Sequence, residues 1–345
     1  MIGILKLSSK ERVNKKGVKF FPWLDNINFI VNTNSVSKID CWAKVHHETG
    51  ELMEIFGPVG HKETEIKAML YWFEIKPCKY PNYRINSQII PQNNPIEVFT
   101  IDNIETQDMD DALSIQVLGP KHYKLGIHIT DITDFITDEL YEWAMLRGTS
   151  VYYDETVCML PPDLTYNYMS LSESSIRKCI TLWIEWNEDS IIKKYHENTI
   201  VVNTKRLNYD NFKEQLPSEY SILNEITQEE NADDIVSWTM IQYNKYFATT
   251  TDSILFRTAT GYTQDKIEHE KIQCLYTHMT SPIRRFADLY NQMCYHNRQK
   301  DLTNEHMNII NGRVSQVSCF YYNYHIIEIA YKSLDKPIEI KIEQT

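Results

Sequence analysis

The stretch TIDNIETQDMDDALSI, residues 100–115, crowds four aspartates between two runs of strand-forming residues. They are Asp102, Asp108, Asp110 and Asp111. Ionised carboxylates this close repel each other, and a pair at ~4 Å costs on the order of 1–4 kcal/mol unless a positive charge lies among them. Oxygen ligands without His or Cys favour Mg²⁺ or Mn²⁺. The stretch therefore predicts a metal site for phosphate chemistry, with a solvated acidic loop as the alternative. A calcium-binding loop does not fit, because the stretch lacks the central glycine and the final glutamate of such a loop.

A second pattern is YTHMTSPIRRFADL, residues 276–289. Pro282 suits the first turn of a helix, with the threonine or serine before it as N-cap. Arg284 and Arg285 would then lie at a helix N-terminus, where anions are favoured and a guanidinium can bind phosphate through two hydrogen bonds. The alternative is a surface ion pair with Asp288. Taken with the aspartates, this pattern predicts a phosphodiester hydrolase.

The composition sets outer bounds on these hypotheses. The chain has 345 residues, 42% hydrophobic and 24% charged, as in a globular protein of about two domains. A net charge of −12 argues against a surface that binds nucleic acid everywhere, although a local basic channel is compatible with it. No apolar run is long enough for a membrane helix or a secretory signal, and the seven cysteines are odd in number and scattered. We expect a cytoplasmic or nuclear protein with reduced thiols, neither secreted nor bound to a membrane.

The N-terminal part is the basic part of the chain. Residues 1–90 hold 13 Lys and Arg against 9 Asp and Glu, a balance of +4, which leaves −16 for the rest. Short β-branched and aromatic runs separated by Asn, Asp and Gly-Pro are typical of a small antiparallel barrel. Lys15 and Lys16 precede Phe20 and Trp23, and cations beside aromatic rings suit a surface that binds single-stranded RNA. The alternative is a solvated charged face beside core aromatics.

Downstream, the pattern predicts an α+β domain. Strand-like runs occupy 98–101, 112–117, 123–129 and 181–187, and helical spacing dominates from Asp233 onward. Two prolines mark a linker over 76–84. We therefore expect a cold-shock or OB-type barrel over residues 1–85 and a catalytic domain over residues 86–345, with no barrel behind it.

The four aspartates resemble the D-x-x-x-x-x-D-x-D-D signature of the RNase II (RNB) exoribonucleases. Further segments resemble blocks of that family in the family's order: GIHITDITDFI (126–136), RGTSVYYDETVCMLPPDL (147–164), SLSES (170–174) and YTHMTSPIRRFADL (276–289). The N-terminal segment is similar to the barrel that precedes this domain, most of all in the exosome exonuclease branch. The resemblance implies an RNB catalytic domain with a β-sheet core and helices behind an OB-type barrel.

The same resemblance implies a function and residue roles. Family members degrade single-stranded RNA from the 3′ end by Mg²⁺-dependent hydrolysis, with Mn²⁺ as a possible substitute, and release nucleoside 5′-monophosphates. The four aspartates match the metal-binding carboxylates, with Asp110 also catalytic. Arg284 and Arg285 match the position that stabilises charge on the scissile phosphate. Tyr152 and Tyr209 match RNA-binding tyrosines, and core packing is the alternative for both.

Some features depart from the family pattern. The segment between Tyr209 and residue 240 is short, and Trp238 stands where an acidic residue linked to ribose recognition would align. These departures motivate a second hypothesis, a catalytically weak RNA-binding or assembly protein with the same fold. A third is an exonuclease indifferent to the sugar. We expect a monomer or a subunit of an RNA-processing complex.

Overall fold

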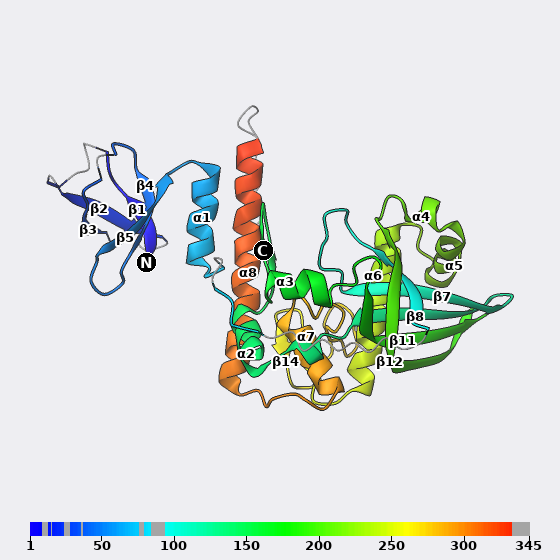
Figure 1. Cartoon of the computed structure of the whole chain (residues 1–345). Coiled ribbons are helices and arrows are strands. Elements are labelled where there is room, and N and C mark those ends of the chain that lie inside the picture. Colours follow the sequence, from blue (N-terminus) through cyan, green and yellow to red (C-terminus); the bar gives the residue numbers. More distant parts are fainter. Residues whose placement is uncertain are drawn as a thin grey trace. The chain divides into compact units, whose positions relative to one another are not determined.

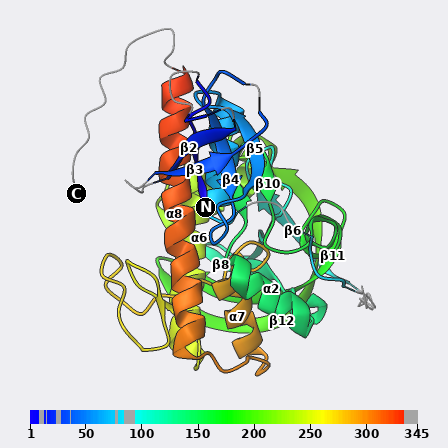
Figure 2. The same cartoon turned by 90° about the vertical axis from the view of Figure 1, so that its left-hand side faces the viewer.

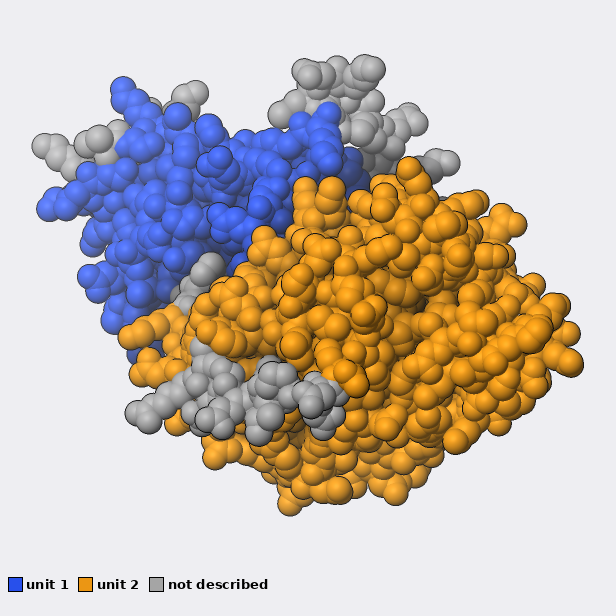
Figure 3. Space-filling model, turned by 45° about the vertical axis from the view of Figure 1, so that its right-hand side comes forward, with its two compact units in different colours: residues 1–78, 151–157, 315–345 blue, residues 79–150, 158–314 orange. Residues whose placement is uncertain are grey.

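The computed structural model describes residues 1–8, 13–14, 16–23, 28–35, 37–75, 79–83 and 94–332 (Figure 1). The chain divides into two compact units, coloured separately in Figure 3. Unit 1 comprises residues 1–78, 151–157 and 315–345, and unit 2 comprises residues 79–150 and 158–314. Within the described residues, no helix is both long and apolar enough to cross a membrane.

Unit 1 is built on a five-stranded antiparallel sheet with the order β3-β2-β1-β4-β5. Its strands are β1 (Ile2–Leu5), β2 (Gly17–Pro22), β3 (Phe29–Asn32), β4 (Cys41–Val45) and β5 (Leu52–Pro58). Alternate residues of β2, such as Val18 and Phe20, are fully buried with Leu5 and Val31, so one face of the sheet forms the core. The small OB-type β domain predicted at the N-terminus is confirmed; the short strand β1 was not foreseen.

Three further pieces complete unit 1. Helix α1 (Lys62–Trp72) follows the sheet, and β9 (Val151–Tyr152) pairs with β10 (Thr156–Val157). The last part of α8 (Asn304–Lys332) joins them in an apolar cluster around the fully buried Phe320. Chain segments far apart in the sequence therefore share one core.

Unit 2 is built around a closed barrel of five strands in the order β11-β12-β6-β7-β8, four of them labelled in Figure 1. The strands are β6 (Ile96–Ile101), β7 (Asp111–Gly119), β8 (His122–Thr130), β11 (Ile176–Asn187) and β12 (Ser190–Leu207). Strand β12 pairs in parallel with β6 and antiparallel with β11, which closes the barrel. The four strand-like runs predicted here are confirmed as β6, β7, β8 and β11, whereas the 18-residue β12 was not predicted.

Helices cover the barrel's apolar face. The longer ones are α2 (Asp138–Arg147), α5 (Pro217–Thr227), α6 (Ala232–Thr250) and α7 (Phe286–Tyr295), together with the start of α8. Short elements connect them: a 3₁₀ turn (Thr133–Phe135), α3 (Pro162–Leu164), a π turn (Thr165–Met169), α4 (Phe212–Gln215), β13 (Phe256–Arg257) and β14 (Tyr262–Thr263). Figure 2 shows α2 beside α7, and the centroids of the Tyr141 and Phe286 rings lie 5.3 Å apart. Helix α7 is buried from Phe286 to Cys294, so it is the central helix of the unit.

The other face of β8 and its neighbours carries a buried polar network. His128 is fully buried, and its two ring nitrogens lie 2.8 Å from Ser114 Oγ and 2.8 Å from Thr181 Oγ1. Burial lowers the pKa of His128 to about 3, so the ring is neutral at pH 7. His128 is thus a core histidine whose two ring nitrogens both have hydrogen-bond partners. Gly126, two residues earlier on the same face, leaves room for this network.

Replacing Gly126 by alanine should destabilise the barrel. A Cβ atom there would lie 2.5 Å from His128 Nε2, 2.6 Å from Ser114 Oγ and 2.8 Å from the Trp183 ring. Overpacking of this kind costs roughly 1–3 kcal/mol. Gly119→Ala is the matched control, because its Cβ would meet nothing nearer than 3.8 Å. Urea unfolding should show the loss for Gly126→Ala alone, and equal losses in both variants would contradict this packing.

Candidate active site

Five of the predicted site residues line one cavity of about 370 Å³ in unit 2. They are Asp102, Asp111, Tyr209, Arg284 and Arg285. Asp102 follows the last residue of β6 and Asp111 is the first residue of β7, so two neighbouring strands deliver the carboxylates. Tyr209 follows the end of β12, and Arg284 lies just before α7. The barrel and the helical layer therefore meet at this cavity.

The surroundings of Asp102 and Asp111 disfavour the charged form of both carboxyl groups. Burial, reinforced by the neighbouring Asp111, raises the pKa of Asp102 to about 8, and burial raises the pKa of Asp111 to about 6. Asp102 Oδ2 is buried and has no hydrogen-bond partner among the described residues. Two close carboxylates with an unmet acceptor need a cation to remain ionised.

The donor set fits a magnesium ion. Within the described part of the chain, no three His, Cys, Asp or Glu side chains gather closely enough to form a metal shell by themselves. Magnesium commonly takes one or two protein carboxylates and completes its shell with water and substrate phosphate. Asp102 and Asp111 match that requirement through their hard oxygen atoms and through the unpartnered Oδ2 atom.

Asp110 has a different environment from the adjacent Asp111. Its side chain is only 2% exposed; Oδ1 accepts the Ile283 N–H at 2.8 Å and Oδ2 accepts the Arg284 Nε–H at 3.2 Å. Burial raises the pKa of Asp110 well above its usual value, and Arg284 acts in the opposite direction. Asp108 is also buried and is absent from the cavity wall. The four aspartates thus divide between the cavity and the protein interior.

The helix start predicted at Pro282 is wrong. Residues 282–284 form a turn, and α7 begins at Phe286 with Arg285 as its N-cap. The backbone here pairs with residues 148–150: the Ser150 N–H donates to Arg284 O at 2.9 Å, and the Phe286 N–H donates to Gly148 O at 2.9 Å. The Arg285 N–H still donates to Ser281 O at 3.0 Å, but the Phe286 N–H bonds to Gly148 O instead of continuing the helical pattern to Pro282, and the Asp110 carboxylate accepts the Ile283 N–H.

The two arginines have different surroundings. Arg285 donates from Nε and Nη2 to the two oxygens of Asp288, at 2.9 and 2.8 Å, and Asp288 is 0% exposed. The ion pair expected as an alternative for this motif is present, but its carboxylate is buried and its arginine is only partly exposed, at 26%, rather than both lying on the surface. Arg284 keeps 43% of its side chain exposed while it contacts Asp110. Of the two, Arg284 is better placed to meet a bound phosphate.

The remaining predicted RNA-binding residues lie in different places. Burial raises the pKa of Tyr209 to about 12, and Asp102 and Asp111 add to the shift, so its hydroxyl stays protonated at the cavity wall. Tyr152 belongs to unit 1, where its N–H donates to Tyr321 Oη at 2.9 Å. Lys16 is exposed in unit 1, and Lys15 lies outside the described residues.

One face of α6 contributes wall residues that the sequence reasoning missed. Asp233, Ser237 and Asn244 line the cavity at helical spacing. Trp238, the position singled out earlier, instead packs partly buried against the core. His278 also reaches the wall, and its Nδ1 lies 2.8 Å from Tyr262 Oη. The i, i+4, i+11 spacing of polar residues on α6 was the signal available in the sequence.

Comparison with known proteins agrees with this geometry. The family model of the RNB domain matches residues 93–229, which include the barrel and all four aspartates. The chain contains an RNB domain. Similar curated proteins include ribonuclease R 2 of Lactococcus lactis, 36% identical over 117 residues, or 33% of this chain and 18% of that protein. The exosome complex exonuclease RRP44 homolog A of Arabidopsis thaliana is 28% identical over 202 residues, or 52% of this chain and 21% of that protein. The matched part of the chain thus spans about a fifth of the length of these relatives.

Solved structures show the same fold over more of the chain. Mycoplasma genitalium RNase R in complex with double-stranded RNA has a TM-score of 0.76 at 14% identity, covering 94% of this chain and 84% of that one. Yeast Ssd1, described as a pseudonuclease, has a TM-score of 0.73 at 15% identity, covering 97% of this chain and 60% of that one. The RNB fold is therefore shared by proteins described as nucleases and by one described as a pseudonuclease.

Asp288→Asn should destabilise unit 2 strongly. The substitution removes the charge of the fully buried Asp288 carboxylate and leaves the Arg285 guanidinium, whose side chain is 26% exposed, without a counter-charge, which costs up to about 3–5 kcal/mol. Asp134→Asn is the matched control, because Asp134 is 55% exposed in its pairs with Lys178 and Arg298 and should lose less than about 1 kcal/mol. The free energy of unfolding in urea measures both. A loss for Asp288→Asn as small as the control's would refute the buried pair.

Proposed function

We propose that this chain is a magnesium-dependent exoribonuclease that hydrolyses single-stranded RNA from its 3′ end and releases nucleoside 5′-monophosphates. The observation that carries the proposal is the pair Asp102 and Asp111, held together at the wall of a cavity that also contains Arg284. A carboxylate pair with an unpartnered buried oxygen suits a divalent cation, and the adjacent guanidinium suits the phosphate that such a cation would meet. The RNB domain supports the same reaction class.

The residues of the cavity can be given separate tasks. Asp102 and Asp111 would hold the magnesium ion, and Asp108 and Asp110 would support them from the interior. When bound, the ion would supply Lewis-acid stabilisation of the phosphate and a water of lowered pKa. Arg284, oriented by Asp110, would neutralise charge that develops on the scissile phosphate, a contribution worth roughly 10²–10³ in rate. Arg285 would position Arg284 through its bond to Asp288.

The RNA would be bound by aromatic and basic side chains. Tyr209 presents a protonated hydroxyl and a ring at the cavity, which suits stacking on a terminal nucleotide. Tyr152, Lys15 and Lys16 remain proposed RNA contacts on sequence grounds.

The domain boundary at residues 85–86, the cytoplasmic location and membership of a larger RNA-processing complex also remain predictions.

A second candidate function is RNA binding without turnover. It is favoured by the likeness to yeast Ssd1, a pseudonuclease, and by Trp238, which packs on the core where an acidic side chain was expected. A chain of this kind would keep the fold and bind RNA without shortening it. The intact pair of Asp102 and Asp111 favours the first candidate.

An RNA decay assay separates the two functions. In Mg²⁺, the wild type should shorten 5′-labelled single-stranded RNA to a small end product, and excess EDTA should stop it. Asp111→Asn should abolish decay and Arg284→Lys should slow it about 10²–10³-fold, because a point charge does not reproduce the guanidinium fork. Asp134→Asn, a surface acid, should leave the rate unchanged.

The assay also contains the outcomes that would contradict the first candidate. Tight RNA binding with no decay in the wild type would select the RNA-binding function. A matched DNA oligonucleotide cleaved at the same rate would select an exonuclease indifferent to the sugar.

Magnesium should stabilise the folded protein through Asp102. The pKa of this group rises from 3.8 in the unfolded chain to about 8 in the folded one. Its contribution to the free energy of unfolding is therefore fully present below pH 3.8 and is lost as the pH rises through 8. Asp102→Asn should therefore be the more stable protein in EDTA at pH 8. Mg²⁺ at 100 times its Kd should stabilise the wild type by about 2.7 kcal/mol and the variant far less. If Mg²⁺ raised the thermal unfolding midpoint of the wild type and of Asp102→Asn equally, Asp102 would be excluded as a magnesium ligand.

A further inference from the structure

His278 is a wall residue of the candidate active site to which the roles above give no task. It lines the same cavity as Asp102, Asp111 and Arg284. Its Nδ1 atom lies 2.8 Å from Tyr262 Oη, whereas Nε2 makes no hydrogen bond with any described residue. Nε2 is not among the buried side-chain atoms that lack a partner, so solvent reaches it. Because the ring borders the cavity, the Nε2 edge is open to it.

The bond to Tyr262 decides which ring nitrogen of His278 carries the proton. Tyr262 is only 8% exposed, and among the residues that the structure describes its hydroxyl has no hydrogen-bond partner except His278 Nδ1. A buried O–H that donated to nothing would be costly, so the hydroxyl donates and Nδ1 accepts. A neutral imidazole that accepts at Nδ1 carries its proton on Nε2. His278 therefore presents an N–H donor to the cavity.

The surroundings keep this ring neutral. Burial lowers the pKa of His278 well below its usual value. The guanidinium groups of Arg285, Arg257 and Arg284 act in the same direction, because a second positive charge beside them is unfavourable. A neutral ring cannot give up a proton as an imidazolium would. Its N–H group still donates a hydrogen bond throughout the neutral pH range.

Two tyrosine rings hold the imidazole in place. Tyr262 and Tyr276 both meet it edge to face, with ring centroids 5.7 and 5.8 Å from that of His278. Tyr276 is fixed in turn by Asn244, whose Nδ2 donates to the Tyr276 hydroxyl at 3.1 Å and whose Oδ1 accepts the Met279 N–H at 2.9 Å. A donor held in this way loses little side-chain freedom when it binds an acceptor.

The other groups of the cavity indicate which acceptor this donor would meet. Arg284 follows His278 by six positions on the same segment, so two donors of different kinds border one space. Asp102 and Asp111 are acceptors, but the function proposed above assigns them to a metal ion. A phosphate accepts strongly from N–H groups and would be shared by His278 and Arg284.

We propose that His278 binds a phosphate oxygen of the last linkage of an RNA strand through its Nε2–H group, and that Tyr262 positions the ring for this bond. The proposal rests on the RNA site proposed above and names a further residue that touches the substrate. A neutral donor adds a directional bond without adding positive charge to that of Arg284. It also gives binding that does not change with the protonation of this histidine.

The test is the affinity of the full chain for a fluorescent single-stranded oligoadenylate in EDTA, where RNA is not hydrolysed by a metal-dependent route. Three strands are compared: an unmodified strand, one with an uncharged methylphosphonate at the last linkage, and one with the same group at a central linkage. The wild type should bind the strand modified at its last linkage at least tenfold more weakly than the other two.

His278→Phe should weaken binding of the unmodified and centrally modified strands about 10- to 100-fold, as expected for a lost hydrogen bond to a charged group. It should change binding of the strand modified at its last linkage by less than about threefold. His278→Gln keeps an N–H donor of similar reach and should restore most of the affinity. His122→Phe is the matched control, because His122 is partly exposed beside Glu185 and is not among the described residues that line the cavity.

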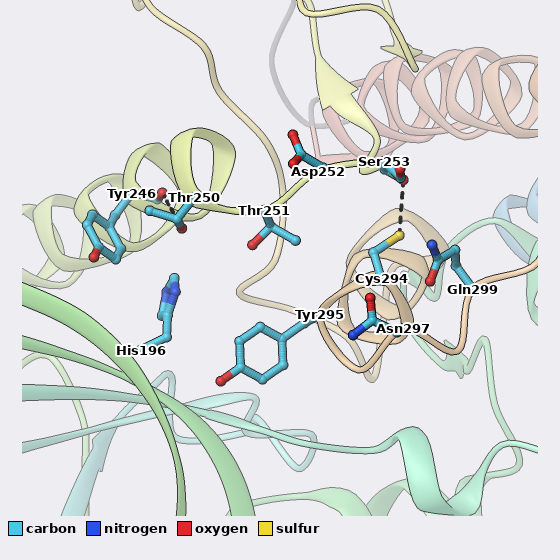
Figure 4. A pocket seen from close by; sticks show the side chains of 10 residues that line it. All are labelled: His196, Tyr246, Thr250, Thr251, Asp252, Ser253, Cys294, Tyr295, Asn297 and Gln299. Carbon is cyan, nitrogen blue, oxygen red and sulfur yellow. Dashed lines mark hydrogen bonds between the residues drawn. The ribbon is translucent and has the colours of Figure 1, made fainter.

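Tyr262→Phe tests the positioning role. It should weaken binding of the unmodified strand about 2- to 10-fold. Figure 4 shows a separate cavity around His196, of about 480 Å³, and none of its described lining residues lines the candidate active site. Tyr246 belongs to it, and its hydroxyl donates one hydrogen bond, to Lys194 O at 2.8 Å. Tyr246→Phe is therefore the matched control and should leave RNA affinity unchanged.

Nuclear magnetic resonance of protein labelled with ¹⁵N in its histidines gives a second readout. The His278 ring should be neutral and protonated on Nε2 between about pH 5 and pH 8. Its Nε2–H signal should move when the unmodified strand binds. In Tyr262→Phe the preference for the Nε2–H form should be lost, which a merely structural role for Tyr262 would not require.

Two results would overturn the proposal alone. They are an equal loss of affinity for all three strands in His278→Phe, and a His278 ring that is protonated on Nδ1 in the wild type. A wild type that binds all three strands equally would instead show that the RNA end does not enter the cavity, which contradicts both this proposal and the exoribonuclease. Failure of RNA decay in Mg²⁺ with the expected binding pattern would contradict the exoribonuclease alone.

Discussion

The buried carboxylate of Asp110 is the contact on which the site depends. Its two oxygens accept hydrogen bonds from Ile283 N–H and Arg284 Nε–H, residues more than 170 positions later in the chain. This contact joins the start of a barrel strand to the turn before α7. Because Asp110 faces the interior, the next residue, Asp111, faces the opposite side, as successive residues at a strand do. The same strand therefore orients an arginine with one aspartate and presents the next to the cavity.

Charge balance explains how the second arginine contributes. Arg285 donates to both oxygens of Asp288, which also accepts the Ser281 N–H at 2.7 Å and so fixes the turn itself. A buried pair of this kind is costly to break and leaves one rigid frame for the partly exposed Arg284. The net charge of −12 is compatible with this arrangement, because two of the acids form the proposed cation site, and the buried Asp110 and Asp288 pair with Arg284 and Arg285.

Much of this could be predicted from the sequence. Strand-like runs over 98–101 and 112–117 flanked the aspartates, and the resemblance to the RNB family pointed to Asp102, Asp111 and Arg284. Strand β12 was missed because its first half is largely exposed and charged, without the alternation that marks a half-buried strand. The helix start at Pro282 was wrong because local capping preferences cannot reveal that residues 148–150 and Asp110 would take the backbone bonds of that turn. Asp233 escaped notice because only the fold brings the first turn of α6 to the ends of β6 and β12.

Helix α6 lines two cavities of different character. Its residues from Asp233 to Asn244 line the acidic cavity with Arg284, and Tyr246 and Thr250 at its C-terminal end line the cavity around His196. Hydrolysis of RNA at the acidic cavity is tested most directly by following where the oxygen atom of water goes. In H₂¹⁸O with Mg²⁺ and single-stranded RNA, the account predicts nucleoside 5′-monophosphates that carry one ¹⁸O atom in each phosphate. Recovery of intact RNA, or of 3′-phosphate or cyclic-phosphate products, would contradict it.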